Sequence, residues 1–329
     1  MAAALPFCEL HLHIEGTLEP PTIFALAAEQ GRALPYAAPE ELAARYEFAN
    51  LPSFLELYYE NMGVLRSEHD FAVLADAYFA RAHRAGVAHV ELFVDPQAHS
   101  ERGVTERTVL RGLQRAIDDA GARFGISAGI IACVLRDRPV DEAERMLDAV
   151  LAAAGETGAP LLGIGLDSAE LGFPPHRFAG VFDRAAEAGL HRVAHAGEEG
   201  PADYVREALD TLGAERIDHG IRVLEDPELV ARLVRERIPL TVCPLSNVRL
   251  RVVDRIEELP FRELLDAGLL VTVNSDDPAY FGGYLDDNLA AVQGAFGLAD
   301  DELSRLARNS VEASFAPEAR KRELLGRLP

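Results

Sequence analysis

Two histidines, His11 and His13, stand one residue apart in the apolar run ELHLHIEG near the start of the chain. In a strand, residues i and i+2 point to the same face, so both imidazoles would project together, away from the alternating aliphatic side chains. Burying two imidazoles is costly unless their lone pairs are accepted, and a divalent metal ion accepts both. An isolated His-x-His pair is more often satisfied by backbone or water at a strand end. The choice therefore depends on further ligand candidates.

Two further candidates occur in the second half of the chain, His195 in RVAHAGE and Asp276 in VNSDDP. Three imidazoles and one carboxylate suit zinc or a similar first-row divalent ion, whereas carboxylates alone would suggest magnesium or calcium. We therefore expect one Zn²⁺ per chain, held by His11, His13, His195 and Asp276. Six other histidines have no further ligand candidates near them in the sequence and are expected to be surface or packing residues: His69, His83, His89, His99, His176 and His191.

Other polar residues beside these ligands have the types that hydrolysis requires. A catalytic zinc keeps one position open for water and lowers the pKa of that water to about 7. His219 in RIDHGI is a candidate to orient and deprotonate the water, and Glu198 is a candidate general acid if enclosure raises its pKa. Asp277 would turn away from the metal in an extended chain and bind substrate. Adjacent aspartates usually mark a turn or helix cap, but the preceding LLVTVNS predicts a strand end.

Eight short β-rich runs position these residues, and amphipathic segments rich in Ala, Leu, Glu and Arg separate them. Such alternation predicts an α/β fold, the (β/α)8 TIM-type barrel. The polar candidates stand at the carboxyl ends of runs, which meet on one face of a closed barrel. An open doubly wound sheet is the alternative, although no G-x-G-x-x-G motif follows any run. The runs are Cys8–Gly16, Val87–Pro96, Ile126–Asp137, Leu161–Glu170, Leu190–Glu198, Arg216–Ile221, Pro239–Asn247 and Leu269–Pro278.

The connection after the first run is too long for a plain crossover. Residues from about 37 to 82, including LPSFLELYYENMGVL, contain at least two extra helical patterns. They would emerge at the active-site rim and serve as a cover, or simply as packing helices. Leu51, Phe54 and Leu55 fall in this segment and fit the face of an amphipathic helix packed on the barrel; the family resemblance described below implies the alternative, an apolar gate over the substrate. No linker or composition break divides residues 1–329, so a single domain is expected.

Composition excludes several classes of partner. Of the 329 residues 49% are hydrophobic, and 54 acidic against 32 basic residues give a net charge of −22, which repels the phosphate backbone of nucleic acids. No apolar stretch reaches membrane-spanning length, and the first residues do not resemble a secretory signal. Cys8, Cys133 and Cys243 lie in apolar runs without C-x-x-C spacing, as expected of reduced thiols in a cytoplasmic protein.

The motifs ELHLHIEG, VAHAGEEG, RIDHGI, TVCPLSN and VNSDDPAYFGG together resemble the adenosine/adenine deaminase family of the amidohydrolase superfamily. The resemblance runs from about Leu5 to the end, in order and with family-like spacing. It implies a zinc barrel that removes the 6-amino group of a purine. In that family's pattern the metal ligands are His11, His13, His195 and Asp276, while Glu198 protonates purine N1, His219 serves the attacking hydroxide and Asp277 bonds to N7.

Two departures separate this chain from the nucleoside enzymes of that family. Their H-x-H-x-D-G motif carries an aspartate that contacts ribose, whereas Glu15 stands here and would push a carboxylate into the space of a sugar. Their fourth strand ends in a D-L-A-G-like turn, whereas Ser168, Ala169 and Glu170 follow Asp167 here. HIEGTLEP, LDSAELGFPP and DPQAH resemble the adenine deaminase branch. We therefore expect adenine to be converted to hypoxanthine and ammonia, with adenosine or an N6-substituted adenine as alternative substrates.

Two other functions fit part of the pattern. A metal-dependent phosphoesterase or amide hydrolase shares the His-x-His strand, but such sites often hold two metals bridged by a carboxylated lysine, and LLGIGLDSAE has no lysine. A non-catalytic zinc-binding barrel would need none of the acid and base residues. The other zinc deaminase architecture requires P-C-x-x-C, which is missing. Asp95 and Gln97 fit a pocket or a loop cap equally, and nothing indicates the oligomeric state.

Overall fold

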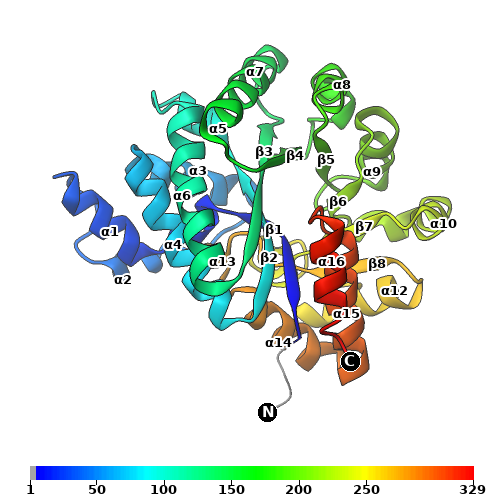
Figure 1. Ribbon diagram of the computed structural model, residues 1–329. Helices are drawn as coiled ribbons and strands as arrows, with labels where there is room; N and C mark the ends of the chain where they lie inside the picture. The colour runs from blue at the N-terminus through cyan, green and yellow to red at the C-terminus, as the bar shows by residue number, and fades with distance from the viewer. Residues whose placement is uncertain (1–4) are drawn as a thin grey trace.

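A computed structural model of the chain describes residues 5–329 and contains eight parallel strands, each hydrogen-bonded to the next in sequence order. All eight predicted runs form strands, and helices between them surround the sheet (Figure 1). The fold is the predicted (β/α)8 barrel. The strands are β1 (Phe7–His13), β2 (Val87–Val94), β3 (Ser127–Leu135), β4 (Leu161–Asp167), β5 (His191–Ala196), β6 (Arg216–His219), β7 (Pro239–Val242) and β8 (Leu270–Val273).

The barrel closes near its mouth, where the first and last strands approach each other. A parallel bridge joins Leu12 to Asp276, just beyond the end of β8. The backbone N–H of His13 donates to the Asp276 carbonyl at 3.0 Å, and the Asp276 N–H donates to the His11 carbonyl at 3.1 Å. Closure of the sheet therefore brings three of the expected ligands together through their own backbone.

The helices cover the outside of the barrel and its rim. Several begin at a side chain that accepts a backbone N–H, such as Asn50 before α3 and Ser67 before α4, each within a capping box. The helices are α1 (Pro20–Glu29), α2 (Pro39–Ala43), α3 (Leu51–Asn61), α4 (Glu68–Arg84), α5 (Pro96–Ser100), α6 (Glu106–Phe124), α7 (Val140–Thr157), α8 (Ala179–Glu187), α9 (Ala202–Glu207), α10 (Pro227–Glu236), α11 (Pro244–Arg249), α12 (Phe261–Asp266), α13 (Pro278–Phe281), α14 (Leu285–Phe296), α15 (Asp300–Ala313) and α16 (Glu318–Leu325).

The long connection between β1 and β2 contains the extra helices predicted after the first strand. Helix α4 packs beside α6 and serves as the crossover helix, while α1, α2 and α3 are additional (Figure 1). The buried side of α3 includes Leu51, Phe54 and Tyr58, and the ring of Phe54 packs at a tilt against that of Phe281 of α13, with ring centroids 4.8 Å apart. Helix α3 is therefore packed against the segment that follows β8.

The inside of the barrel is apolar in its middle and polar at both ends. Phe93, Ile131, Cys133 and Val193 form a buried cluster between the strands. Every residue of β1 is buried, including Glu9 and the two histidines. The three cysteines are buried free thiols. The apolar middle layer thus separates polar groups at the floor from those at the mouth.

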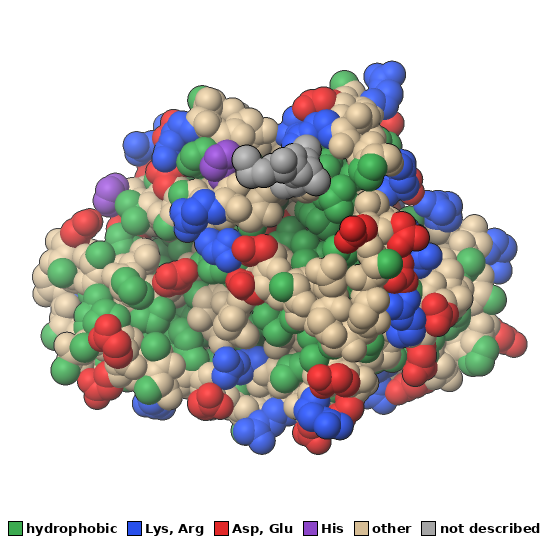
Figure 2. All heavy atoms as spheres, turned by 90° about the horizontal axis from the view of Figure 1, so that it is seen from below, with side chains coloured by type: hydrophobic (Ala, Val, Ile, Leu, Met, Phe, Trp, Pro, Cys, Tyr) green, Lys and Arg blue, Asp and Glu red, His purple; other side chains and the backbone are tan. Residues whose placement is uncertain are grey.

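The outer surface mixes charges of both signs. On the face seen from below, acidic and basic side chains are interspersed (Figure 2). Neighbouring helices exchange ion pairs, as between Arg81 of α4 and Asp286 of α14, whose Nη2 and Oδ1 atoms are 2.8 Å apart. Among the helices of residues 5–329, none is long and apolar enough to cross a membrane.

Candidate active site

The four expected metal ligands meet at the mouth of the barrel. His11 and His13 end β1, His195 lies near the end of β5, and Asp276 follows β8. The Nε2 atoms of His13 and His195 are 3.1 Å apart. Asp276 Oδ1 lies 3.2 Å from His11 Nε2 and 3.5 Å from His13 Nε2. Residues more than 260 positions apart therefore place their ligand atoms within contact distance.

The donor set fits a tetrahedral zinc ion. At zinc–nitrogen distances of 2.0–2.1 Å, two ligand nitrogens of a tetrahedron lie about 3.3 Å apart, close to the separations seen here. Within residues 5–329, His11 Nε2 is buried without a hydrogen-bond partner, as an atom reserved for a metal would be. A second grouping, His11, His195, His219 and Asp276, places one ligand atom of each within 4.8 Å of the others. The shorter contacts of His13 favour His13 over His219.

A buried carboxylate lies behind two of these histidines. Thr241 Oγ1 donates to Asp218 Oδ1 at 2.8 Å and lies 3.0 Å from His11 Nδ1, so a proton on that nitrogen points to Thr241 and leaves Nε2 free to ligate. Asp218 Oδ2 lies 3.7 Å from His195 Nδ1. Carboxylates in this position orient the rings of metal-ligating histidines and raise their basicity. Asp218 was not assigned a role from sequence, although it directly precedes His219.

Burial lowers the pKa of two of the three ligand histidines, whereas the neighbouring Asp276 outweighs burial at His11 and raises its pKa. Burial lowers the pKa of His195 well below the usual value and that of His13 to about 4. Both rings are therefore neutral at pH 7, the form that binds a metal ion. Burial opposes ionisation of Asp276, but the adjacent His11 outweighs it and holds the pKa of Asp276 well below its usual range. This carboxylate is therefore ionised.

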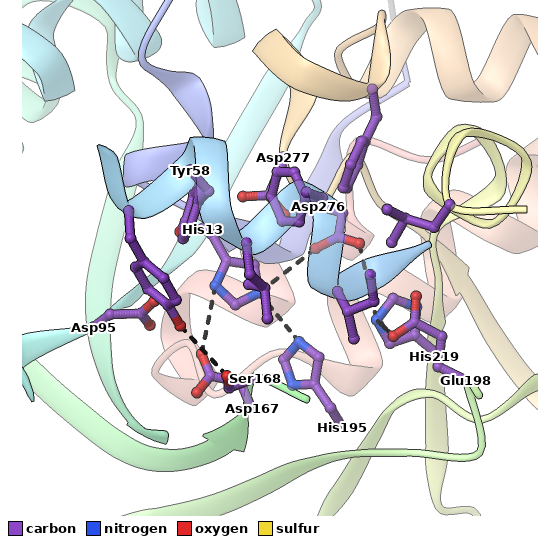
Figure 3. A pocket seen from close by; sticks show the side chains of 16 residues that line it. His13, Tyr58, Asp95, Asp167, Ser168, His195, Glu198, His219, Asp276 and Asp277 are labelled. Carbon is purple, nitrogen blue, oxygen red and sulfur yellow. Dashed lines mark hydrogen bonds and ion pairs between the residues drawn. The ribbon is translucent and has the colours of Figure 1, made fainter. Parts of the chain in front are cut away.

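The predicted acid and base stand side by side. His219 Nε2 lies 3.5 Å from Glu198 Oε2 and 3.8 Å from Asp276 Oδ2 (Figure 3). Burial raises the pKa of Glu198 well above its usual value, and the charges of Asp276 and Glu170 raise it further. Burial lowers the pKa of His219 to about 3. Glu198 is therefore a proton donor and His219 a neutral acceptor.

Asp277 lies beside the ligand group, with one of its oxygens, one of Asp276 and a ring nitrogen of His13 within 4.8 Å of one another, and it packs on the turn after β1. A Cβ atom on Gly16 would lie 2.1 Å from Asp277 Oδ1, so only glycine fits there. Burial raises the pKa of Asp277 well above its usual value, and the neighbouring Asp276 adds to the effect. Protonated Asp277 can donate a hydrogen bond into the pocket, and its Oδ1 has no partner among the described residues.

A small cavity adjoins these groups (Figure 3). Helix α3 supplies five of its lining residues, including the expected gate residues Leu51, Phe54 and Leu55, two of which are also buried in the core. Both interpretations of that segment therefore describe the same helix. The lining residues are His13, Leu51, Phe54, Leu55, Tyr58, Tyr59, Asp95, Asp167, Ser168, His195, Glu198, His219, Leu250, Asp276, Asp277 and Phe281.

Two carboxyl groups line the part of the cavity opposite Glu198 in this view (Figure 3). One oxygen each of Asp95 and Asp167 and a ring nitrogen of His13 all lie within 4.8 Å of one another. Burial raises the pKa of Asp167 to about 7 and that of Asp95 well above its usual value. Asp95 is thus a pocket residue, whereas Gln97 accepts the Leu135 N–H at 3.0 Å and lies outside this cavity.

Glu15 occupies a different place from the one expected for a substrate contact. It is fully buried and is not among the residues that line the cavity. Its Oε1 accepts the Asp95 N–H at 3.1 Å and lies 2.7 Å from His99 Nε2. His99, expected to be a simple packing residue, thus turns the Glu15 carboxylate toward α5. Any influence of Glu15 on substrate passes through Asp95 or the turn that holds Asp277.

The sequence pattern that describes the adenosine deaminase family matches residues 6–329. The chain belongs to this family. It is 60% identical over 311 residues to an adenine deaminase from Streptomyces coelicolor, covering 94% of this chain and 90% of that protein. It also resembles the crystal structure of an adenine deaminase from Arthrobacter aurescens, with a TM-score of 0.95, 54% identity and 98% of both chains covered. An amidohydrolase from Burkholderia ambifaria, solved with bound zinc, has a TM-score of 0.87 and 27% identity over 98% of this chain and 88% of that one.

Membership of the adenosine deaminase family makes the chain a hydrolase that acts on C–N bonds of cyclic amidines.

Three strand ends in this site have a positive φ at a residue other than glycine: Ser168 (71°), His219 (63°) and Asp276 (64°). Such backbone conformations cost on the order of 1–3 kcal/mol each and gather at functional sites. The residue types at these three positions do not indicate a positive φ, so these backbone conformations could not be predicted from the sequence.

Proposed function

We propose that the whole chain acts as a single-domain, zinc-dependent adenine deaminase that converts adenine and water to hypoxanthine and ammonia. The observation that carries the proposal is a buried, protonated Glu198 beside a convergent set of three histidines and an aspartate. The names of the similar proteins from Streptomyces coelicolor and Arthrobacter aurescens support adenine as the substrate.

One Zn²⁺ per chain would be held by His11, His13, His195 and Asp276, whose ligand atoms lie close enough together to bind one ion. The zinc-bound structure of the amidohydrolase from Burkholderia ambifaria supports this metal. When bound, zinc lowers the pKa of a coordinated water to about 7 and supplies a nucleophile at neutral pH.

The acid and base complete the reaction at the purine. Glu198 donates its proton to N1, which makes C6 accept the oxygen of water, because an aromatic amidine carbon resists attack until its ring nitrogen is protonated. Neutral His219 accepts a proton from that water and returns it to the departing amino group; as ammonia leaves, the proton of the new C6 hydroxyl passes to Glu198, so that C6 becomes a carbonyl and the acid is restored. Protonated Asp277 donates a hydrogen bond to N7, a ring nitrogen that has only a lone pair to offer.

The acidic part of the cavity favours a free base over a nucleoside. The carboxyls of Asp95 and Asp167 line the cavity and offer acceptor oxygens. Free adenine carries an N9–H that can donate to such an oxygen, whereas in adenosine that nitrogen bears ribose. A site built to bond a polar hydrogen rejects the analogue that lacks it, because its buried polar groups are then left without a partner.

Ammonia release from purified zinc-loaded protein tests the function. The assay compares adenine, adenosine and N6-methyladenine at equal concentrations and measures the metal content of the same sample. We expect adenine to be the best substrate and the zinc-to-chain ratio to approach one. A higher kcat/KM for adenosine would contradict the free-base assignment, and absence of ammonia release from any aminopurine would contradict the deaminase assignment.

We also propose that the protein works in the cytoplasm on a small-molecule purine. Cys8, Cys133 and Cys243 are buried free thiols, which is typical of proteins in a reducing compartment. Because such buried thiols are shielded from oxidants, we expect the protein to keep its activity when it is purified without a reductant.

A further inference from the structure

A buried carboxylate outside the ligand set binds the turn that carries Glu198. Glu170, three residues after β4, is 1% exposed. Its Oε1 accepts the backbone N–H of Gly197 at 2.7 Å. Its Oε2 accepts the backbone N–H groups of Glu198 at 3.2 Å, Glu199 at 2.9 Å and Gly200 at 2.7 Å. Four consecutive amides are therefore directed at one carboxylate, the arrangement by which a backbone turn binds an anion.

The shape of the turn matches this carboxylate closely. A Cβ atom on Gly200 would lie 2.5 Å from Glu170 Oε1, too close for any side chain. Gly197 has a φ of +73°, a conformation that glycine adopts without strain. The motifs DSAELG and HAGEEG, whose Glu170 and Gly197 lie 27 residues apart, are thus the two halves of one structure.

A buried arginine that follows β3 also binds the end of β5. Arg136, directly after β3, is fully buried. Its Nη1 donates to the His195 carbonyl at 2.7 Å, and its Nε donates to the Phe173 carbonyl in the loop after β4 at 2.8 Å. The end of β5 is therefore attached to both β3 and the loop that contains Glu170.

The side chain of Glu198 has few contacts that could hold it in place. Within the part of the chain that the structure describes, its Oε1 has no hydrogen-bond partner, and its Oε2 lies 3.5 Å from His219 Nε2. In Figure 3 this carboxyl lies beside His219 at the edge of the cavity. Its position is therefore set mainly by the backbone to which it is attached, and that backbone is bound by Glu170.

We propose that Glu170 is the positioning residue for the acid Glu198: its carboxylate binds the four amides of residues 197–200 and so holds the Glu198 carboxyl at the purine. The inference rests on the proposed function, in which Glu198 delivers the proton. A displacement of about 1 Å in a reacting group can cost on the order of 10²-fold in rate. Glu170 contacts neither the ligand atoms nor the cavity; it holds Glu198 through the turn, and its charge also raises the pKa of Glu198, an effect that Gly200→Ala leaves in place.

The first test is Glu170→Gln, which keeps the size of the side chain but turns an NH₂ group toward backbone N–H donors. We expect kcat for adenine to fall about 10²-fold, the KM to stay within about threefold and the zinc content to be unchanged. Glu91→Gln is the matched control, because Glu91 is also a fully buried glutamate that accepts a backbone N–H but lies at the barrel floor. The control should lower the melting temperature and leave the kcat of the folded protein unchanged.

A double-mutant cycle with Glu198→Gln separates positioning from a purely structural role. If Glu170 acts through Glu198, the double variant should have the same kcat as Glu198→Gln alone, because the group to be positioned has lost its function. Multiplicative losses, or a Glu170→Gln variant with lowered stability and unchanged kcat, would overturn the proposal.

Gly200→Ala repeats the test if Glu170→Gln does not fold, since its methyl group displaces the Glu170 carboxylate while the charge is kept. The same drop in kcat at unchanged zinc content is expected, and an unchanged kcat would refute the positioning role. The parent protein's activity toward adenine reports separately on the proposed function, so failure of one idea is distinguishable from failure of the other.

Discussion

The floor and the mouth of the barrel both bury glutamates, but they surround them differently. At the floor, Glu91 Oε2 accepts from Arg216 Nη1 at 2.6 Å, and Oε1 accepts the Phe315 N–H. Arg216 also donates to the Leu10 carbonyl at 3.0 Å. At the mouth, Glu198 is equally enclosed, yet its Oε1 has no partner among residues 5–329 and its nearest charged neighbours are other acids.

The partner decides the charge of each buried carboxyl. Burial opposes ionisation of Glu91, but the Arg216 charge outweighs it and lowers the pKa of Glu91 to about 2. Burial raises the pKa of Glu198, the charge of Asp276 raises it further, and the smaller opposing effect of Arg136 does not offset them. One residue type at a similar depth is thus an anion that joins strands in one place and, in the other, a carboxyl with a raised pKa, as the proposed general acid requires. A buried acid that is paired with a cation is typical of a structural ion pair, whereas a buried acid without such a partner is a candidate for a functional site.

Removing a ligand at the mouth should have the largest effect. We expect His195→Ala to lose zinc and all measurable turnover, because the variant lacks one of the four expected ligands and the other three do not hold the ion. His191→Ala is the matched control: it lies on the same strand at the opposite end and pairs with Glu215 at 2.9 Å. Metal analysis and ammonia release on both variants make the comparison, and stoichiometric zinc with full activity in His195→Ala would refute the ligand assignment.

Replacing the acid should stop proton transfer and leave the fold intact. Glu198→Gln is expected to retain zinc and adenine binding while kcat falls by roughly 10²–10⁴-fold, the typical contribution of general acid catalysis. Glu199→Gln, on the same turn but outside the cavity lining, should stay near the parent. If kcat of Glu198→Gln remains within a few-fold of the parent, another residue delivers the proton.

The reverse pattern is expected at the floor. Glu91→Gln should lower the free energy of unfolding by about 3–5 kcal/mol, since Arg216 would remain buried without its partner, and should not change the kcat of the folded protein. Because the folded pKa of about 2 lies below the ordinary 4.5, the ionised form stabilises the fold above pH 4.5, and that stabilisation is lost as pH falls toward 2. Denaturant unfolding at pH 7 and pH 3 should therefore show a larger acid loss in the parent than in the variant.

The smallest effect is expected at Glu15, whose pairing is intermediate between those of Glu91 and Glu198. Its Oε1 is hydrogen-bonded, but no residue from 5 to 329 bonds its Oε2. Glu15→Asp shortens the side chain and breaks the 2.7 Å contact with His99. We expect the ratio of kcat/KM for adenine over adenosine to fall by about tenfold without reversing, in the range of one lost contact. An unchanged ratio would place selectivity in Asp95 and Asp167 alone.

Much of the fold and the proposed ligand set could be predicted from the sequence, because each strand and the residues that end it are recognisable from a short stretch of the chain. Each strand shows its own apolar run, and a barrel brings all carboxyl ends to one face, so His11, His13, His195 and Asp276 could be grouped without coordinates. The general acid followed in the same way from its place three residues after His195. Chemical type and strand position were sufficient for these assignments.

Partner choice required the tertiary structure. Glu15 and His99 lie 84 residues apart, and Glu170 and the Gly197 turn lie 27 apart, and neither pairing leaves a periodic signal. The sequence by itself determined which strands form, which side chains end them and hence what chemistry the mouth of the barrel can perform. Only the folded chain decided which buried carboxylates are neutralised, bound by amides or left protonated. The physical reason is that the pKa of a buried acid depends on atoms a few ångströms away, which the fold supplies from distant parts of the chain.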